Sequence, residues 1–447
     1  MSDELDELIQ FLGATRADAR AQAAEIVQGL TGTDDGIAQL ATKAETLIPK
    51  LLHLMGAPAA ESRPATTALV NLTGASEVAT LAVEKGAVER AMQFLRGAGG
   101  EDSAGCPADL LLSVLVNVTN TEGGVHVFAQ EGKSLEGFFV AKLVQMLAEG
   151  TPAAQFDRAA SVLTNVCRHP AGRRNFLEPS RRLVRATLAS LKPSAPETRR
   201  VGVAAALRNC CADARGCESV LAAVGSGNAA AVAAEASVAG FAKVGASGAT
   251  EGGLEVVRAL LAPVSGGTGG AGVGKERCDA VRQSCAEAVA CLADCEGGRA
   301  ALVQCDAPRL MRLGYADEDH GETAEAMEIA AEKFLRFGMV PAELQPADGL
   351  RRVVHSVFAS RAVHARARDG VVDERAWRER GVDPHRARRD TCATFGVETS
   401  MRWGLAMRRG SSLASRRRRR TSKRAGCCAT GSLTRSRMSA RAARAAA

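Results

Sequence analysis

The residues of this sequence whose types could bind a metal are its cysteines. There are 13 among 447 residues, and Cys291 and Cys295 stand four apart, so that on a helix they could share a zinc ion. No second pair of cysteines or histidines at a known spacing supplies the remaining ligands. We therefore expect reduced cysteines that fill small places in the core, and no metal.

A glycine-rich stretch, SGGTGGAGVGKE at 265–276, is the place where a nucleotide could be sought. Gly267, Gly269 and Gly272 form a GxGxxG pattern, and Gly269 with Lys275 forms part of a P-loop. Glu276 stands where the P-loop needs a Ser or Thr hydroxyl for magnesium, and neither pattern lies in a strand–helix context. The stretch favours a flexible linker. No catalytic motif appears among the seven His, so we expect neither an enzyme nor a cofactor.

One asparagine recurs in a small apolar stretch such as AALRNCCAD at 205–213. Its copies are Asn71, Asn117, Asn165 and Asn209, with Gly29 before them and Cys291 after them in the same place. The steps between successive copies are 42, 46, 48, 44 and finally 82 residues. The last step holds either two units or one unit and an insertion.

This period is that of armadillo or HEAT repeats. A helical hairpin of about 40 residues cannot bury both faces alone, so successive copies must stack around one shared core. We predict an all-α, right-handed helical-repeat solenoid, a monomer that begins with a capping unit at residues 1–30. The aromatic content of 3% agrees with thin layers of helix on helix.

The asparagines have two interpretations. Asn is a mediocre helix former, so its return near the end of one helix per unit indicates a positional role. It either lines a concave face and hydrogen-bonds a partner's backbone, or caps and braces the adjacent turn. The Arg cluster at 168–185 is a solvated face or a surface for an acidic partner. The candidate partner-binding residues are Asn71, Asn117, Asn165, Arg168, Arg208 and Asn209.

Composition divides the chain into four parts. Residues 1–224 and 277–340 read as repeats, separated by an Ala/Gly-rich insertion or linker at 225–276 and followed by a basic tail at 341–447. The tail holds 25 Lys and Arg against 9 Asp and Glu, a net charge of +16. Since the whole chain carries +7, residues 1–340 carry −9.

The tail contains five consecutive Arg at 416–420, and its composition predicts disorder. Such a run could bind RNA or an import receptor, or the segment could be a mispredicted reading frame. The acidic N-terminus lacks the features of a signal peptide, and no apolar stretch is long enough to span a membrane. We expect a cytoplasmic protein, with the nucleus as an alternative because of the tail.

Three stretches resemble the HGH-one family, which is armadillo-like. They are GVAAALRNCCAD at 202–213, SVLTNVCRHPAGRRNFLEP at 161–179, and the segment from Arg282 to Phe337. The resemblance covers roughly residues 1–340. It implies an adaptor that helps newly made translation elongation factor two to fold, together with the cytosolic chaperonin and prefoldin. The insertion and the basic tail depart from the family pattern and inherit nothing from it.

A non-enzymatic, protein-binding scaffold is the function class that these observations favour, because a solenoid presents a long surface to a partner. The alternative is an armadillo adaptor in nuclear import or RNA association that acts through the Arg-rich tail. Binding that maps to residues 1–340 would favour the first class, and binding lost with residues 416–420 would favour the second.

Overall fold

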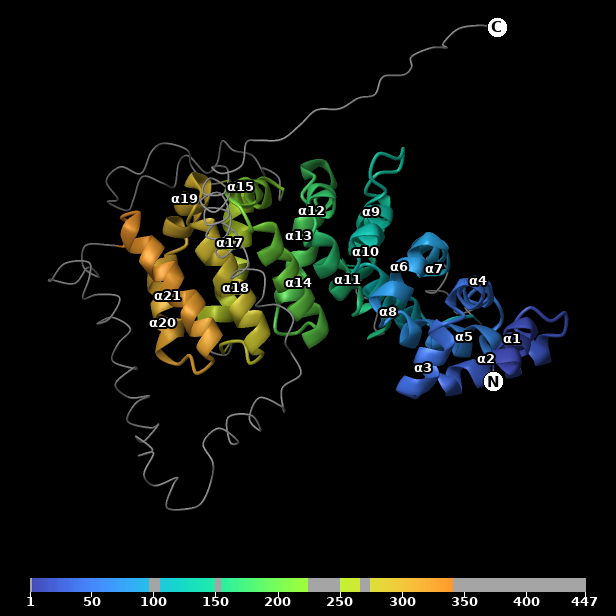
Figure 1. The fold of residues 1–447 in the computed structure, drawn as a ribbon. Helices are drawn as coiled ribbons and strands as arrows, with labels where there is room; N and C mark the ends of the chain where they lie inside the picture. Colours follow the sequence, from blue (N-terminus) through green and yellow to red (C-terminus); the bar gives the residue numbers. More distant parts are fainter. Residues whose placement is uncertain (1, 96–104, 149–153, 224–249, 266–273, 341–447) are drawn as a thin grey trace, which may run out of the picture. The chain divides into compact units, whose positions relative to one another are not determined.

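A computed structural model describes residues 2–95, 105–148, 154–223, 250–265 and 274–340 of the chain. Every regular element in these ranges is a helix (Figure 1). The predicted all-helical repeat fold is therefore confirmed. The predicted basic tail at 341–447 lies outside the described residues.

The helices follow one another in units of three, which we call the first, second and third helix of a unit. Two N-terminal helices, α1 (Ser2–Phe11) and α2 (Ala17–Leu30), precede the first complete unit. The first three units are α3 (Asp34–Ala41), α4 (Ala44–Leu54) and α5 (Ala59–Leu72); α6 (Ser76–Glu84), α7 (Ala87–Leu95) and α8 (Ala108–Val118); and α9 (Glu122–Ala129), α10 (Phe138–Ala148) and α11 (Ala159–Cys167).

Three further units complete the described chain. They are α12 (Pro170–Phe176), α13 (Leu183–Leu188) and α14 (Glu197–Cys210); α15 (Ala214–Ala222), α17 (Glu251–Ser265) and α18 (Asp279–Leu292); and α19 (Glu296–Gln304), α20 (Ala307–Ala316) and α21 (Gly321–Arg336). Three short 3-10 helices lie between them, η1 (Ala154–Phe156), η2 (Pro179–Arg181) and η3 (Ala189–Leu191).

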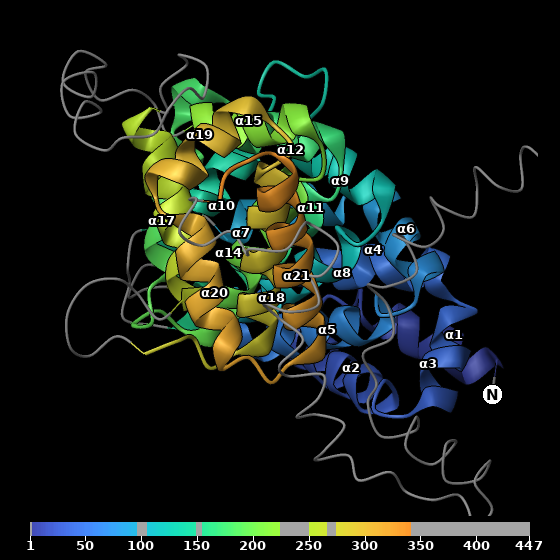
Figure 2. The same cartoon turned by 90° about the vertical axis from the view of Figure 1, so that its left-hand side faces the viewer.

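The third helices form a continuous series, in which each one packs on the third helix of the next unit. The contacts run from α2 through α5, α8, α11 and α14 to α18 and α21. In the last two units, α18 and α21 lie side by side in both views (Figures 1 and 2). The buried Leu, Val and Ala side chains of all the units form one apolar core. Stacked repeats need such a core, because a single unit cannot bury both of its faces.

In five of the six described units, a glycine at the third position of the first helix lets that helix lie close to the end of the unit before it; α6 has Val78 at this position. In α9, a Cβ atom on Gly124 would lie 1.9 Å from the carbonyl oxygen of Val118, the last residue of α8. The Thr121 hydroxyl caps α9 by accepting a hydrogen bond of 3.1 Å from the same glycine's N–H. Gly36, Gly172, Gly216 and Gly298 repeat this close approach in their own units.

The 82-residue interval between Asn209 and Cys291 contains one unit in the described residues, with α15 and α17 as its first two helices. Part of the range predicted as a linker, 225–276, is thus helical. Val256, Val257 and Leu260 are fully buried at helical spacing, and the flanking glycines concealed this pattern in the sequence. Residues 224–249 and 266–273, on either side of α17, lie outside the described residues.

Most of the cysteines that the structure describes lie in the core. Cys210, Cys211 and Cys285 are fully buried, and burial raises the pKa of the Cys285 thiol to about 12. Cys295 caps α19, since its sulfur accepts a hydrogen bond of 3.3 Å from the Gly298 N–H. Within the described ranges, no three His, Cys, Asp or Glu side chains are grouped so that they could hold a metal ion. None of the described helices has both the length and the apolar character that crossing a membrane requires.

Candidate functional site: the third-helix face

The recurring asparagines lie near the ends of consecutive third helices. Asn71 Nδ2 donates to the Thr31 hydroxyl, just after α2, at 2.9 Å, and the other three asparagines each donate to the third helix before their own. The Asn117 Nδ2 group donates to the Val70 carbonyl at 2.9 Å, and Asn165 Nδ2 donates to that of Val116 at 2.9 Å. Asn209 Nδ2 donates to the Thr164 carbonyl at 3.1 Å. In all three cases the acceptor immediately precedes the asparagine of the previous unit. The brace therefore crosses between units, and is not made to the adjacent turn of the same helix.

Two threonines fix the orientation of these amides. The Thr73 hydroxyl donates to the Leu69 carbonyl at 2.7 Å, so its oxygen is left to accept from Asn117 Nδ2 at 3.1 Å. Thr119 has the same two bonds, to Leu115 and from Asn165. A carbonyl and a committed hydroxyl can only accept here, so the amide must present its NH₂ group to them.

The amide oxygens of these asparagines differ from the Nδ2 groups in their hydrogen bonding. Among the described residues, no group donates to Oδ1 of Asn71, Asn117 or Asn165, while Asn209 Oδ1 accepts from Arg208 at 3.1 Å. All four side chains are half-buried. The series therefore offers hydrogen-bond acceptors to a partner, and its donors are already used within the fold.

An open groove of about 410 Å³ adjoins Asn165, between α11 and α14. Small residues line it, among them Ser161 and Ala205. Gly202 brings the two helices together, because a Cβ atom there would lie 2.6 Å from the backbone of Ala160. The groove leaves room for a partner side chain beside the free amide oxygen.

The two predicted arginines are placed differently. Arg208 lies on α14 next to Asn209, and its Nη1 group approaches Glu287 Oε2 on α18 at 3.3 Å. Arg168 is the exposed C-cap of α11 and donates to Asn120 Oδ1 at 3.0 Å. Arg208 thus extends the asparagine series, whereas Arg168 lies beyond the end of its helix.

Sequence reasoning missed a second set of contacts, at the starting ends of the third helices. Each joins an arginine to a carboxylate of a neighbouring unit. The pairs are Arg20–Glu61 at 2.6 Å, Arg158–Asp109 at 2.6 Å, Arg199–Asp157 at 2.5 Å and Arg282–Glu318 at 2.7 Å. We call these the arginine clasps. In two pairs the arginine precedes its carboxylate in the chain and in two it follows, so no repeated spacing predicts them.

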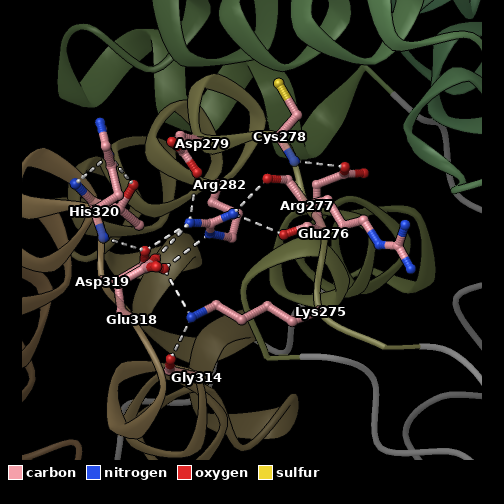
Figure 3. A network of polar contacts seen from close by, with 11 residues as sticks. Lys275, Glu276, Arg277, Cys278, Asp279, Arg282, Gly314, Glu318, Asp319 and His320 are labelled. Carbon is pink, nitrogen blue, oxygen red and sulfur yellow. Dashed lines mark hydrogen bonds and ion pairs between the residues drawn. The ribbon is translucent and has the colours of Figure 1, made fainter.

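The clasp of Arg282 and Glu318 is the most buried of the four (Figure 3). Two guanidinium nitrogens bind the two carboxylate oxygens, at 2.9 and 2.7 Å, and Lys275 Nζ approaches the same carboxylate at 2.8 Å. Burial alone would raise the pKa of Glu318, but hydrogen bonds from Arg282, Lys275 and the His320 N–H lower it to about 2. Lys275, which the sequence placed in a possible phosphate loop, is thus a structural partner of a carboxylate.

These helices and their shared core define the class of the protein, a helical-repeat scaffold. A solved structure described as "A conserved phosphorylation switch controls the interaction between cadherin and beta-catenin in vitro and in vivo" has a TM-score of 0.50 with it. The sequence identity is 11%, and the match covers 75% of this chain and 58% of that one. At this identity the likeness shows the fold alone.

Sequence comparison then shows what the chain is similar to. Residues 101–267 match the family model described as "Domain of unknown function (DUF383)". Protein HGH1 homolog from Xenopus tropicalis is 32% identical over 216 residues, 46% of this chain and 56% of that protein. The protein of the same name from Dictyostelium discoideum is 26% identical over 216 residues, 47% of this chain and 59% of its own length.

The chain is a relative of the HGH1 homologues, and the resemblance found in its sequence is confirmed. The matched region spans just over half the length of these relatives. This similarity and the fold together support a protein-binding helical scaffold.

Proposed function

We propose that this chain is a cytosolic adaptor that holds a partner protein on the third-helix face. The observation that carries the proposal is the series of amide oxygens of Asn71, Asn117 and Asn165, which receive no hydrogen bond from the described residues. A buried or half-buried acceptor gains from a donor, and an extended or incompletely folded chain offers backbone N–H groups along its length.

The proposed partner is newly made translation elongation factor two. This choice rests on the relationship to the HGH1 homologues, together with the adaptor role that the resemblance implies. In that role the protein would act as a monomer and would pass the factor between prefoldin and the cytosolic chaperonin. The open groove beside Asn165 is suited to a chain that has not yet buried its own side chains.

The test is co-purification of elongation factor two and the chaperonin from one cell extract with wild-type protein and two variants. Asn117→Ala with Asn165→Ala removes two of the three amide oxygens that receive no hydrogen bond, and should weaken recovery roughly tenfold to a hundredfold. Ala205→Trp fills the groove and leaves every asparagine brace in place, so it should weaken recovery without loosening the fold.

The matched control is Ala214→Trp, which puts the same bulk on an exposed first-helix position. Recovery of the factor with Ala205→Trp at the wild-type level would move the site away from this face. If the wild-type protein recovers neither the factor nor the chaperonin, the proposed client is wrong.

A further inference from the structure

A pocket of about 480 Å³ lies between α13 with η3 on one side and α17 on the other. Its lining comes from the second helices of two successive units and from the linkers next to them, and no third helix takes part. We call it the second-helix pocket. Leu188, Leu191 and Pro263 are buried in its wall. Its volume is in the range that ligand sites occupy.

The wall of the pocket is held by its own polar contacts. The Glu276 N–H donates to the Pro263 carbonyl at 3.1 Å, and the Glu276 carboxylate binds Arg200 Nε at 2.8 Å. Arg200 also donates to the Ala195 carbonyl, which ties the linker after η3 to the same group. Glu276 is 8% exposed, and its charge is compensated within the protein. The pocket is therefore formed before any ligand arrives.

The rim of the pocket is cationic. Arg185, Lys192 and Arg258 line it, against Glu255 and the already paired Glu276. Arg185 lies 3.3 Å from Glu255 and Arg258 lies 3.1 Å from Glu251, but all four side chains are about half exposed, and such surface pairs stabilise little. The Lys192 ammonium has no carboxylate partner among the described residues. This positive rim stands out on residues 1–340, whose net charge is −9.

We propose that the second-helix pocket binds a segment of a partner protein in which a Leu- or Phe-sized side chain is flanked by Asp or Glu. The apolar side chain would enter between Leu188, Leu191 and Ala259. Carboxylates on either side would meet Lys192 and Arg258 on the rim. The apolar insertion supplies most of the affinity, and the carboxylates supply a salt-sensitive attraction that selects acidic partners.

Charge and lining together favour an acidic segment with one apolar side chain over a purely apolar ligand or a simple anion. An apolar wall alone would accept any hydrophobic residue, and a cationic rim alone would accept any anion. Their combination selects a ligand that has both features within a few ångströms. The third-helix face, which offers neutral acceptors, would not select such a segment. The pocket therefore adds a second point of attachment that does not depend on the proposed client.

The first experiment measures binding of a fluorescein-labelled peptide, Gly-Asp-Leu-Phe-Asp-Asp, to the full-length protein by fluorescence polarisation. Two matched peptides carry Asn in place of each Asp, or Ser in place of Leu and Phe. We expect binding of the first peptide that weakens with added salt, and at least tenfold weaker binding of both matched peptides.

The second experiment uses variants of the pocket. Ala259→Phe fills it from α17, and Lys192→Glu with Arg258→Glu reverses two charges on the rim. Both should reduce peptide binding at least tenfold. Arg312→Glu, which reverses an exposed charge on α20, is the matched control and should leave it unchanged. If Ala259→Phe does not fold, the rim variant decides, because both of its positions are exposed.

Three results would overturn the proposal. The first is no binding of the acidic peptide at about 1 mM, the weakest affinity of interest. The second is binding of dodecanoic acid, with no binding of the peptide, which would assign the pocket to a small amphiphile. The third is a concentration-dependent dimer that the Ala259→Phe variant abolishes, which would make a second copy of the chain the occupant. None of these results bears on recovery of elongation factor two.

Discussion

The two ends of the third helices are tied to their neighbours by different chemistry. At the C-terminal ends, neutral amides repeat one hydrogen bond from unit to unit, as Asn117 and Asn165 show. At the N-terminal ends, the arginine clasps join an arginine to a carboxylate, and the position of that carboxylate differs from pair to pair. The asparagine hydrogen bonds should contribute the same stability over a wide range of pH and salt concentration, because they involve no charged group. The charged set depends on both, and most strongly on how deeply each pair is buried.

The largest effect is expected from the buried clasp. Glu318→Ala removes the buried partner of Arg282 and leaves it only the more exposed Asp279 and Asp319, which costs about 3–5 kcal/mol in the free energy of unfolding. Chemical denaturation of the two proteins measures this. Asp319→Ala is the control, because that side chain is 89% exposed and only 3.7 Å from the same guanidinium. A loss below that of the control would show that the clasp is dispensable.

The same carboxylate predicts a pH dependence. Its folded pKa of about 2 is below the value of about 4.3 for an unfolded Glu. Glu318 therefore stabilises the fold fully above pH 4.3, and this contribution is lost as the pH falls toward 2. Wild-type protein should lose more stability in this interval than Glu318→Gln, which cannot titrate. Parallel curves would contradict the assignment.

Next in size is Gly124→Ala at the joint between α8 and α9. The added methyl would lie 1.9 Å from the Val118 carbonyl, so the backbone must shift, at a cost of about 1–3 kcal/mol. Gly123→Ala is the matched control, since a Cβ atom there meets nothing within 4 Å. The ratio of the two effects, read from thermal unfolding, tests whether close approach is the reason for the glycine.

Asn165→Ala should cost about 0.5–1.5 kcal/mol, the usual worth of a neutral hydrogen bond. The loss should be the same at low and high salt and from pH 5 to pH 8, because no charge is involved. Denaturation midpoints under these conditions measure it. A loss that falls with salt would mean that the neutral and charged ends are not separate in their energetics.

The smallest effect is expected from the exposed clasp of Arg158 and Asp109, whose side chains are 52% and 46% exposed. Arg158→Ala should cost about 0.2–1 kcal/mol at low salt and almost nothing at high salt. Thermal unfolding at the two salt concentrations checks this. A larger, salt-resistant loss would place this pair with the buried clasp.

The regular spacing of the asparagines determines which features could be predicted from the sequence. The repeat fold and the asparagine series were predictable, because Asn71, Asn117, Asn165 and Asn209 return at nearly constant steps. The partners of their Nδ2 groups were not, since spacing gives the unit but not the contact between units. A further signal was available: Gly124, Gly172, Gly216 and Gly298 each follow the asparagine place by seven residues.

The clasps and the second-helix pocket could not be predicted in this way. Arg282 pairs with a carboxylate later in the chain, whereas Arg158 and Arg199 pair with an earlier one, so no common register exists. Helix α17 was hidden for another reason. Its apolar residues stand between long Ala/Gly-rich tracts, and composition over the wider window outweighed the local period. With α17 assigned to a linker, the pocket beside it had no second wall.

The asparagine brace has a direction. Each amide donates backward, to the unit that precedes it in the chain, and the last turn of that unit needs only a carbonyl to receive it. A whole unit can therefore be gained or lost at the C-terminal side without breaking any earlier asparagine brace. A single residue inserted within a third helix would instead rotate its asparagine by about 100° and break the bonds on both sides. Length variation in such a chain should accordingly collect between helices.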